Sequence, residues 1–218
     1  MSGTFPVTDF DNVTIKSTAP TITTVAISGQ RQSKQIAGQY FEIDIDLVPL
    51  SRAGFASVMG FLSKQRNALL SFQIVIPRIS TASGDVVAVG AANTGLSDVM
   101  LVTSNVSAGG STVAFDTAYN SSYFTGTLSA NQGLRAGDFV KFSNHDKVYQ
   151  ITEDVTFNVT GGGTMTIFPN LTDGVVGSTT TITYKDVPFT VFSKNSTQEY
   201  AFGTGDNNKI SLSLQEAL

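Results

Sequence analysis

Apolar and polar residues alternate over residues 40–48, which is the clearest periodic signal in the chain. The apolar positions are Phe41, Ile43, Ile45 and Leu47, and the polar positions between them are Glu42, Asp44 and Asp46. A period of two places these two sets on opposite faces of a strand. The pattern predicts a half-buried strand with an acidic outer face, which Pro49 ends because proline cannot donate to a sheet ladder.

The period changes to 3.6 residues directly after this strand. Apolar residues recur with the spacing i, i+3, i+4, i+7 at Phe55, Val58, Met59 and Leu62. Ser51 is a favourable N-cap, and Lys64 and Arg66 fall in the last turn, where positive charge complements the helix dipole. We therefore predict one helix, over about residues 51–66.

Alternation returns over residues 70–76, and again over residues 209–214 near the end of the chain. The last segment repeats the pattern of residues 41–47, so we expect these two segments to be strands of one sheet, with the residues between them inserted. The helix is long enough to connect parallel strands, but antiparallel pairing of residues 40–48 with residues 70–76 is equally open.

The composition shifts to Ala, Gly, Ser, Thr and Asn over residues 78–133, which indicates a loop-rich β segment. Residues 138–142 and 147–151 flank a polar turn and predict a hairpin. With further β-prone stretches, through residues 187–192, they predict a compact β module over residues 134–192. The expected fold class is mainly β: a sandwich or barrel core with one helix, formed by residues 1–77 and 193–218, and an inserted β-rich region, residues 78–192.

The chain of 218 residues contains no cysteine, which excludes a disulfide scaffold and a thiolate metal site. Charged residues make up 14% and the formal net charge is −4. No stripe of Lys and Arg is present, so we expect no sequence-specific nucleic-acid binding. The sequence also shows no signal peptide and no apolar run of roughly 20 residues, so we expect a soluble protein made in the cytoplasm, with no membrane insertion.

The acidic face of residues 40–48 is the first candidate for chemistry. Two carboxylates at this spacing could serve a glycan-degrading enzyme or a calcium ion. Carboxylates on one strand diverge and leave no cleft between them, so we favour a solvated or subunit-facing acidic surface. His145, the one histidine, lies in the polar turn of the predicted hairpin, where we expect it to be exposed to water. We therefore expect no enzyme, no catalytic residue, no cofactor and no metal.

A carbohydrate-binding or receptor-binding module is the alternative function. Aromatic side chains of the inserted region could stack on sugars, although tryptophan is absent from the chain. These side chains are Tyr119, Tyr123, Phe124 and Tyr149.

Basic residues suggest where subunits could meet. Arg31 and Lys34 precede the acidic strand and could pair with its carboxylates in the same or a neighbouring subunit. At an interface, such pairs would set register and partner choice. The candidate interface residues are Arg31, Lys34, Glu42, Asp44, Asp46, Arg52, Lys64 and Arg66.

Several short motifs occur together in this chain. In the first part they are Gln30-Arg31-Gln32-Ser33, Gly38-Gln39-Tyr40-Phe41-Glu42-Ile43, Leu50-Ser51-Arg52-Ala53 and Phe72-Gln73-Ile74-Val75-Ile76-Pro77. In the later part they are Arg135-Ala136-Gly137-Asp138-Phe139-Val140-Lys141-Phe142, Lys147-Val148-Tyr149 and Phe168-Pro169. Together they resemble structural proteins of the tails and baseplates of tailed bacteriophages, over roughly residues 29–77 and 135–218.

The resemblance implies a core sheet that is shared around a homo-oligomeric ring and decorated by an inserted β module. It implies contacts with other tail or baseplate proteins, assembly in the host cytoplasm, and a final location in the virion tail. No catalytic residue comes with it. If the ring surrounds a DNA passage, the acidic face would reduce adhesion of phosphate groups, which is a hypothesis.

Overall fold

A computed structural model describes residues 3–6, 9–36, 38–66, 68–84, 100–117, 133–156, 162–200 and 208–217. The chain is mainly β with one described helix, which confirms the expected fold class. It divides into two compact units: residues 1–74 with 190–218, and residues 75–189. The boundaries predicted from the sequence, residues 77 and 193, lie within three residues of these.

The first unit contains a five-stranded sheet in the order β1-β4-β13-β12-β5. Its strands are β1 (Phe10–Thr18), β4 (Tyr40–Leu47), β5 (Phe72–Ile74), β12 (Phe189–Ser193) and β13 (Ser211–Glu216). β4 is antiparallel to both β1 and β13, and Ile43 lies opposite Leu214 while Ile45 lies opposite Leu212. The expectation that residues 41–47 and 209–214 share a sheet is thus confirmed. β5 belongs to the same sheet but is separated from β4 by β13 and β12.

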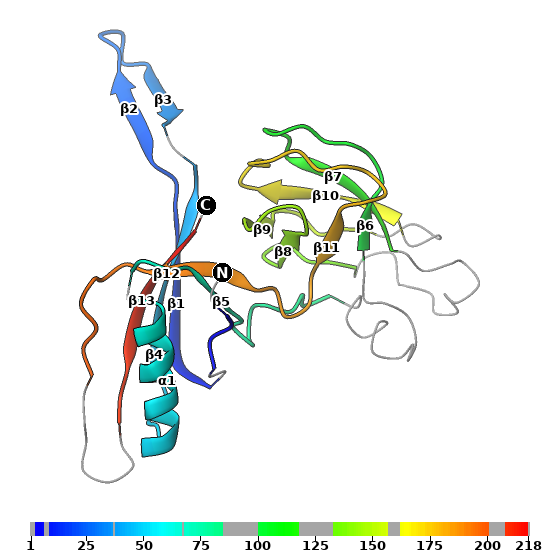
Figure 1. Cartoon of the computed structure of the whole chain (residues 1–218). Helices are drawn as coiled ribbons and strands as arrows, with labels where there is room; N and C mark the ends of the chain where they lie inside the picture. Colours follow the sequence, from blue (N-terminus) through cyan, green and yellow to red (C-terminus); the bar gives the residue numbers. More distant parts are fainter. Residues whose placement is uncertain are drawn as a thin grey trace. The chain divides into compact units, whose positions relative to one another are not determined.

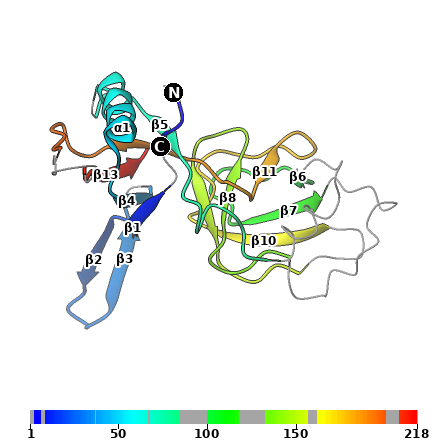
Figure 2. The same cartoon turned by 90° about the horizontal axis from the view of Figure 1, so that it is seen from below.

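One helix, α1 (Arg52–Lys64), connects β4 to β5, close to the predicted range. Ser51 caps it, since its side chain accepts a hydrogen bond from the Gly54 N–H. Figures 1 and 2 show α1 against one face of the sheet. Its buried side chains are Phe55, Val58 and Leu62, and the apolar side chains of β4 are buried as well. Burial of each large apolar side chain contributes roughly 1.5–3 kcal/mol, so this packing holds a helix that contains two glycines.

A hairpin connects β1 to β4 and extends beyond the five-stranded sheet. It consists of β2 (Thr21–Val25) and β3 (Arg31–Gln35), which form a two-stranded sheet of their own. We call residues 20–36 the arm. Figure 1 shows it extending past the ends of β1 and β4. Gly29 closes its turn with a φ of 81°, a left-handed conformation that glycine adopts at little cost. The strands β1, β2 and β3 were not predicted from the sequence.

The second unit is a closed barrel in the strand order β10-β7-β6-β11-β8-β9. Its strands are β6 (Met100–Val102), β7 (Thr112–Thr117), β8 (Phe139–Phe142), β9 (Val148–Ile151), β10 (Gly162–Phe168) and β11 (Thr181–Thr183). The hairpin predicted over residues 138–151 is confirmed as β8–β9. The segment expected to be loop-rich supplies β6 and β7, so residues 134–192 do not form the barrel alone.

Residues 187–192 were expected to belong to the barrel module, and this prediction was wrong for β12. β12 pairs with β13 in the sheet of the first unit. Most residues of β12 are buried, so the strand shows no alternation that would reveal its partner.

The chain enters and leaves the second unit at adjacent points. The Ala82 N–H donates to the Tyr184 carbonyl, and the Val187 N–H donates to the Ser80 carbonyl, both at 2.8 Å. The side chain of Thr81 also contacts Asp186. This short antiparallel contact is what an inserted module requires, because it lets the flanking chain resume its own sheet.

Candidate subunit interface

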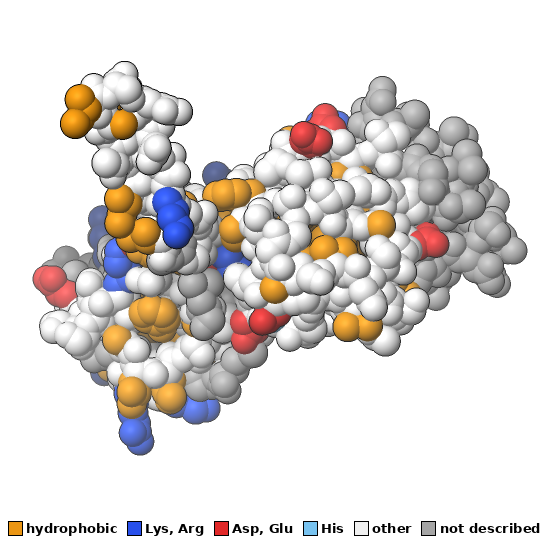
Figure 3. All heavy atoms as spheres, turned by 90° about the horizontal axis from the view of Figure 1, so that it is seen from above, with side chains coloured by type: hydrophobic (Ala, Val, Ile, Leu, Met, Phe, Trp, Pro, Cys, Tyr) orange, Lys and Arg blue, Asp and Glu red, His pale blue; other side chains and the backbone are white. Residues whose placement is uncertain are grey.

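Every residue of the two arm strands is exposed to solvent. Ile22 is 55% exposed, Val25 is 64% exposed, and Ile27 in the turn is fully exposed. Figure 3 shows apolar side chains, in orange, at the end of the arm. Exposed apolar residues that occur singly are ordinary, but a whole element without a buried side is not.

The arm gains little stability from its own contacts. Ile22 lies opposite Lys34, and Val25 lies opposite Arg31. The aliphatic stems of the two cationic side chains can cover part of these apolar neighbours. A pair of this kind contributes about 0.2–1 kcal/mol, and an isolated two-stranded hairpin is only marginally stable in water. The arm therefore stands to gain stability from any surface that it docks on.

Arg31 and Lys34 do not act as one basic cluster. They are three positions apart on β3, so their side chains point to opposite faces of the arm. Each face thus carries one cation beside one apolar side chain.

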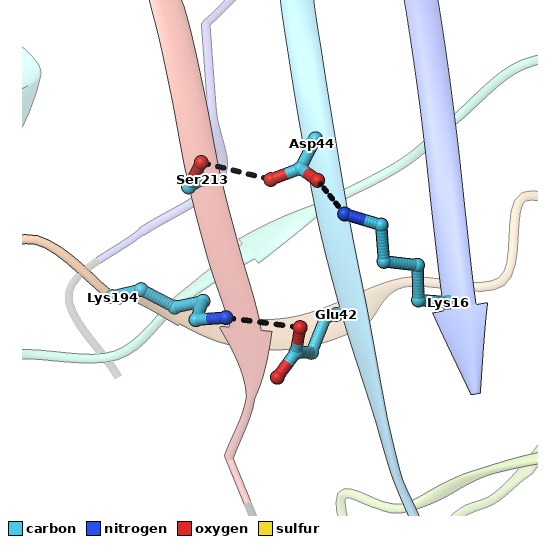
Figure 4. A network of polar contacts seen from close by, with 5 residues as sticks. All are labelled: Lys16, Glu42, Asp44, Lys194 and Ser213. Atoms are coloured by element: carbon cyan, nitrogen blue, oxygen red, sulfur yellow. Dashed lines mark hydrogen bonds and ion pairs between the residues drawn. The ribbon is translucent and has the colours of Figure 1, made fainter. Parts of the chain in front are cut away.

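On the acidic face of β4, Asp44 is held by side chains from both neighbouring strands (Figure 4). The Lys16 ammonium lies 2.6 Å from one carboxylate oxygen, and the Ser213 hydroxyl donates to the other at 2.8 Å. These hydrogen bonds, first that of Lys16 and then that of Ser213, hold the pKa of Asp44 below its ordinary value. The same hydrogen bond to Asp44 raises the pKa of Lys16.

Glu42 and Asp46 also have partners within the chain. The Lys194 ammonium lies 2.9 Å from a Glu42 carboxylate oxygen, and the Ser211 hydroxyl donates to Asp46 at 2.6 Å. Lysines therefore balance two of the three charges, which weakens the hypothesis of a strongly acidic lumen. Within the chain, the cations on this face are Lys16 and Lys194 and not the predicted Arg31 and Lys34. Pairing between subunits stays a prediction.

The remaining predicted interface residues lie at the two ends of α1. Arg52 is its first residue, Lys64 its last, and Arg66 follows with a φ of 51°. All three are exposed. A helix of 13 residues is about 20 Å long, so these cations do not form one cluster. The eight predicted residues thus fall on three surfaces: the arm, the polar face of β4, and the ends of α1.

His145 is half-buried, and the expectation of a water-exposed histidine was wrong. One ring nitrogen lies 2.7 Å from the Tyr149 hydroxyl and the other lies 2.9 Å from the Asn144 side-chain oxygen. The Tyr149 hydroxyl also accepts a hydrogen bond from the Thr172 N–H. Burial is the main cause that lowers the pKa of His145. These contacts fasten the turn of the β8–β9 hairpin to the chain at Thr172.

Tyr149 is fully buried, so it cannot offer a face to a sugar. The other aromatic residues considered for stacking, Tyr119, Tyr123 and Phe124, lie outside the described residues.

An open groove of about 720 Å³ lies beside β13 in the first unit. Residues 194–199 line it together with Lys209, Ser211 and Ser213, and all of these side chains are polar. It therefore lacks the apolar and aromatic lining that usually dominates ligand sites. Within the described ranges, no group of three His, Cys, Asp or Glu side chains could hold a metal ion. The same ranges contain no helix with the length and apolar character needed to cross a membrane.

No protein-family model matches the chain, and no curated protein sequence matches it.

Proposed function

We propose that the chain is a structural subunit of a bacteriophage tail or baseplate, which assembles with copies of itself into a ring and contacts other tail proteins. The observation that carries the proposal is the arm, whose two strands are exposed at every residue. A hairpin of this kind is poorly stable alone and gains stability when another chain covers it.

The sheet of the first unit offers a further place for strand addition. β1 is an edge strand of nine residues, and β2 follows it after Ala19 and Pro20. Among the described residues, no strand pairs with the outer side of either one. At the opposite edge, residues near the N-terminus bridge to β5, since the Phe5 N–H donates to the Gln73 carbonyl. Unpaired edges are the sites at which sheets join between chains.

The bacteriophage part of the proposal depends on the motifs of residues 29–77 and 135–218, which resemble tail and baseplate structural proteins. The ring is the closed form of edge pairing: a head-to-tail contact gives a ring when the rotation between copies closes, and an open filament when it does not.

Mass photometry and negative-stain electron microscopy of the full chain test the proposal. We expect a discrete oligomer that appears as closed rings. A chain that stays monomeric at every concentration, and that mass spectrometry does not detect in purified virions of the phage encoding it, would overturn the proposal.

A further inference from the structure

The direction of the arm's backbone groups identifies the part of it that can bind another chain. The Ile36 N–H donates to the Pro20 carbonyl, and the Ala26 N–H donates to the Gln30 carbonyl. Hydrogen-bonded positions alternate along an antiparallel ladder, so the even-numbered residues of β2 bond to β3. The odd-numbered residues Thr21, Thr23 and Val25 then direct their N–H and C=O groups away from the arm. The same alternation directs the N–H and C=O groups of Arg31 and Ser33 away from β2, toward the outer edge of β3.

Both outer edges are open. Within the described residues, no strand pairs with the outer edge of β2 or of β3. Each edge is therefore able to accept one strand from a second chain.

The two edges differ in charge. β2 has the sequence Thr-Ile-Thr-Thr-Val, which is uncharged and rich in β-branched residues, and it lacks the charged or proline residues that protect edge strands from pairing. β3 carries Arg31 and Lys34, and no Asp or Glu occurs between Asp11 and Glu42. Two β3 strands side by side would bring like charges together with no carboxylate of the arm to offset them.

Pairing of β2 with β2 from a second copy avoids this repulsion, but it leaves both β3 edges open. Pairing of β2 with β3 of the next copy places one uncharged strand between every two cationic strands. Cations of successive copies are then separated by two strand spacings, about 10 Å, which is about one Debye length at 0.1 M salt. This arrangement also provides partners for the outward groups of both edges.

We propose that the arms of successive copies join edge to edge, with β2 of one copy antiparallel to β3 of the next, to form one continuous sheet. This inference rests on the proposed ring and identifies the strands that hold it together. If the register within the arm repeats between copies, Ile22 of each copy lies between two Lys34 side chains, whose stems cover it.

Two proline substitutions test the proposal at the backbone. Thr23→Pro removes an outward N–H from β2, and Ser33→Pro removes an outward N–H from β3, while the hydrogen bonds within the arm are kept. Proline is tolerated on an edge strand where the N–H faces solvent. Thr23→Val and Ser33→Val are the matched controls, because they change the side chain and keep the N–H.

We expect each proline variant to shift the concentration at which rings form by about tenfold or more, as measured by mass photometry. Both valine variants should assemble like the original chain. At concentrations where the chain is monomeric, circular dichroism should show the same thermal unfolding for the proline and the valine variants. The reason is that every residue of the arm strands is exposed.

A mixing experiment tests the head-to-tail direction. Thr23→Pro retains an intact β3 edge and Ser33→Pro retains an intact β2 edge, so an equimolar mixture should form dimers of one copy of each variant. Neither variant should form these dimers alone.

Three results would overturn the inference. Rings that still form with either proline substitution would show that the arm edges do not make the contact between subunits, although the proposed ring would stand. Loss of assembly in only one proline variant would indicate pairing between identical strands. An original chain that never assembles would overturn the proposed function, and this inference with it.

Discussion

Single residues on the polar face of β4 are held by side chains from the adjacent strands β1 and β13 and from the segment after β12. Asp44 is the best connected of them, since it binds both Lys16 of β1 and Ser213 of β13. The contact with Lys16 is exposed to solvent, so its effect is better measured on ionisation than on overall stability.

Replacement of Lys16 by methionine should raise the pKa of Asp44 toward its ordinary value. The folded state holds the pKa of this carboxyl low, so its contribution to stability is present above the ordinary pKa of about 3.9 and is lost as the pH falls through the folded value. NMR titration of the Asp44 carboxyl measures the shift directly. Lys64→Met, at the end of α1, is the control and should leave the titration of Asp44 unchanged. An unaltered Asp44 pKa in Lys16→Met would contradict the assignment of Lys16 as its main partner.

His145 should make the stability of the second unit depend on pH. Its pKa is lowered in the folded state, so the unfolded chain binds the proton more readily, and stability declines as the pH falls below about 6.5. The decline ends once the pH is below the folded pKa. Asp173 and Asp146 favour the charged ring, while Lys141 and Lys147 oppose it.

Urea denaturation of the original chain and of His145→Gln, at about pH 7.5 and about pH 5.5, measures this effect. The variant cannot take up the proton, so it should lose less stability than the original chain between the two pH values. Equal losses would show that other groups cause the pH dependence.

At the scale of secondary-structure elements, burial separates α1 from the arm. Leu62→Ala, on the buried side of α1, should lower the free energy of unfolding by about 2–5 kcal/mol, because it leaves a cavity in the core. Ile22→Ala, on the exposed arm, should change it by less than about 0.5 kcal/mol in the monomer. Chemical denaturation, at protein concentrations too low for assembly, measures the change in the free energy of unfolding of both variants. A large loss in Ile22→Ala would show that the arm is packed in the monomer.

The same contrast explains which elements could be predicted from sequence. β4, β13 and α1 each bury one side, so their apolar residues recur with a period of two or 3.6. β2 and β3 are exposed on both faces, and β12 is buried at most positions, so none of them shows such a period. Alternation at Val13 and Ile15, and the glycine at position 29, were the signals that could have indicated the long hairpin.

The candidate interface could be predicted only in part for a related reason. The acidic face follows from the alternation of residues 41–47, whereas its lysine partners come from β1 and from the segment after β12. Those contacts arise from pairing between segments far apart in sequence, which residue patterns alone do not reveal. The barrel was also hard to predict from the sequence, because β6 and β7 are short strands in a stretch of small and polar residues.

For the whole molecule, the proposed assembly would use the first unit and leave the second as an inserted module. The arm, the helix and the edge strand β1 belong to the first unit, while the described strands of the second unit close into a barrel. Net charge is divided as well: residues 75–189 contain five Lys or Arg and nine Asp or Glu, whereas the remainder contains eight of each. The negative charge of the chain therefore resides in the inserted unit.

A chain that lacks the second unit should still fold and form rings. Residues 81–186 can be replaced by a short Gly-Ser turn, because the Ser80 carbonyl and the Val187 N–H that it would connect are already hydrogen-bonded at 2.8 Å. β5 and β12, on either side of the junction, keep their neighbours in the sheet. We expect mass photometry to show the same number of subunits as in the full chain. Folded monomers would instead show that the inserted unit contributes to the contact between subunits, and unfolded chains would show that the first unit depends on it.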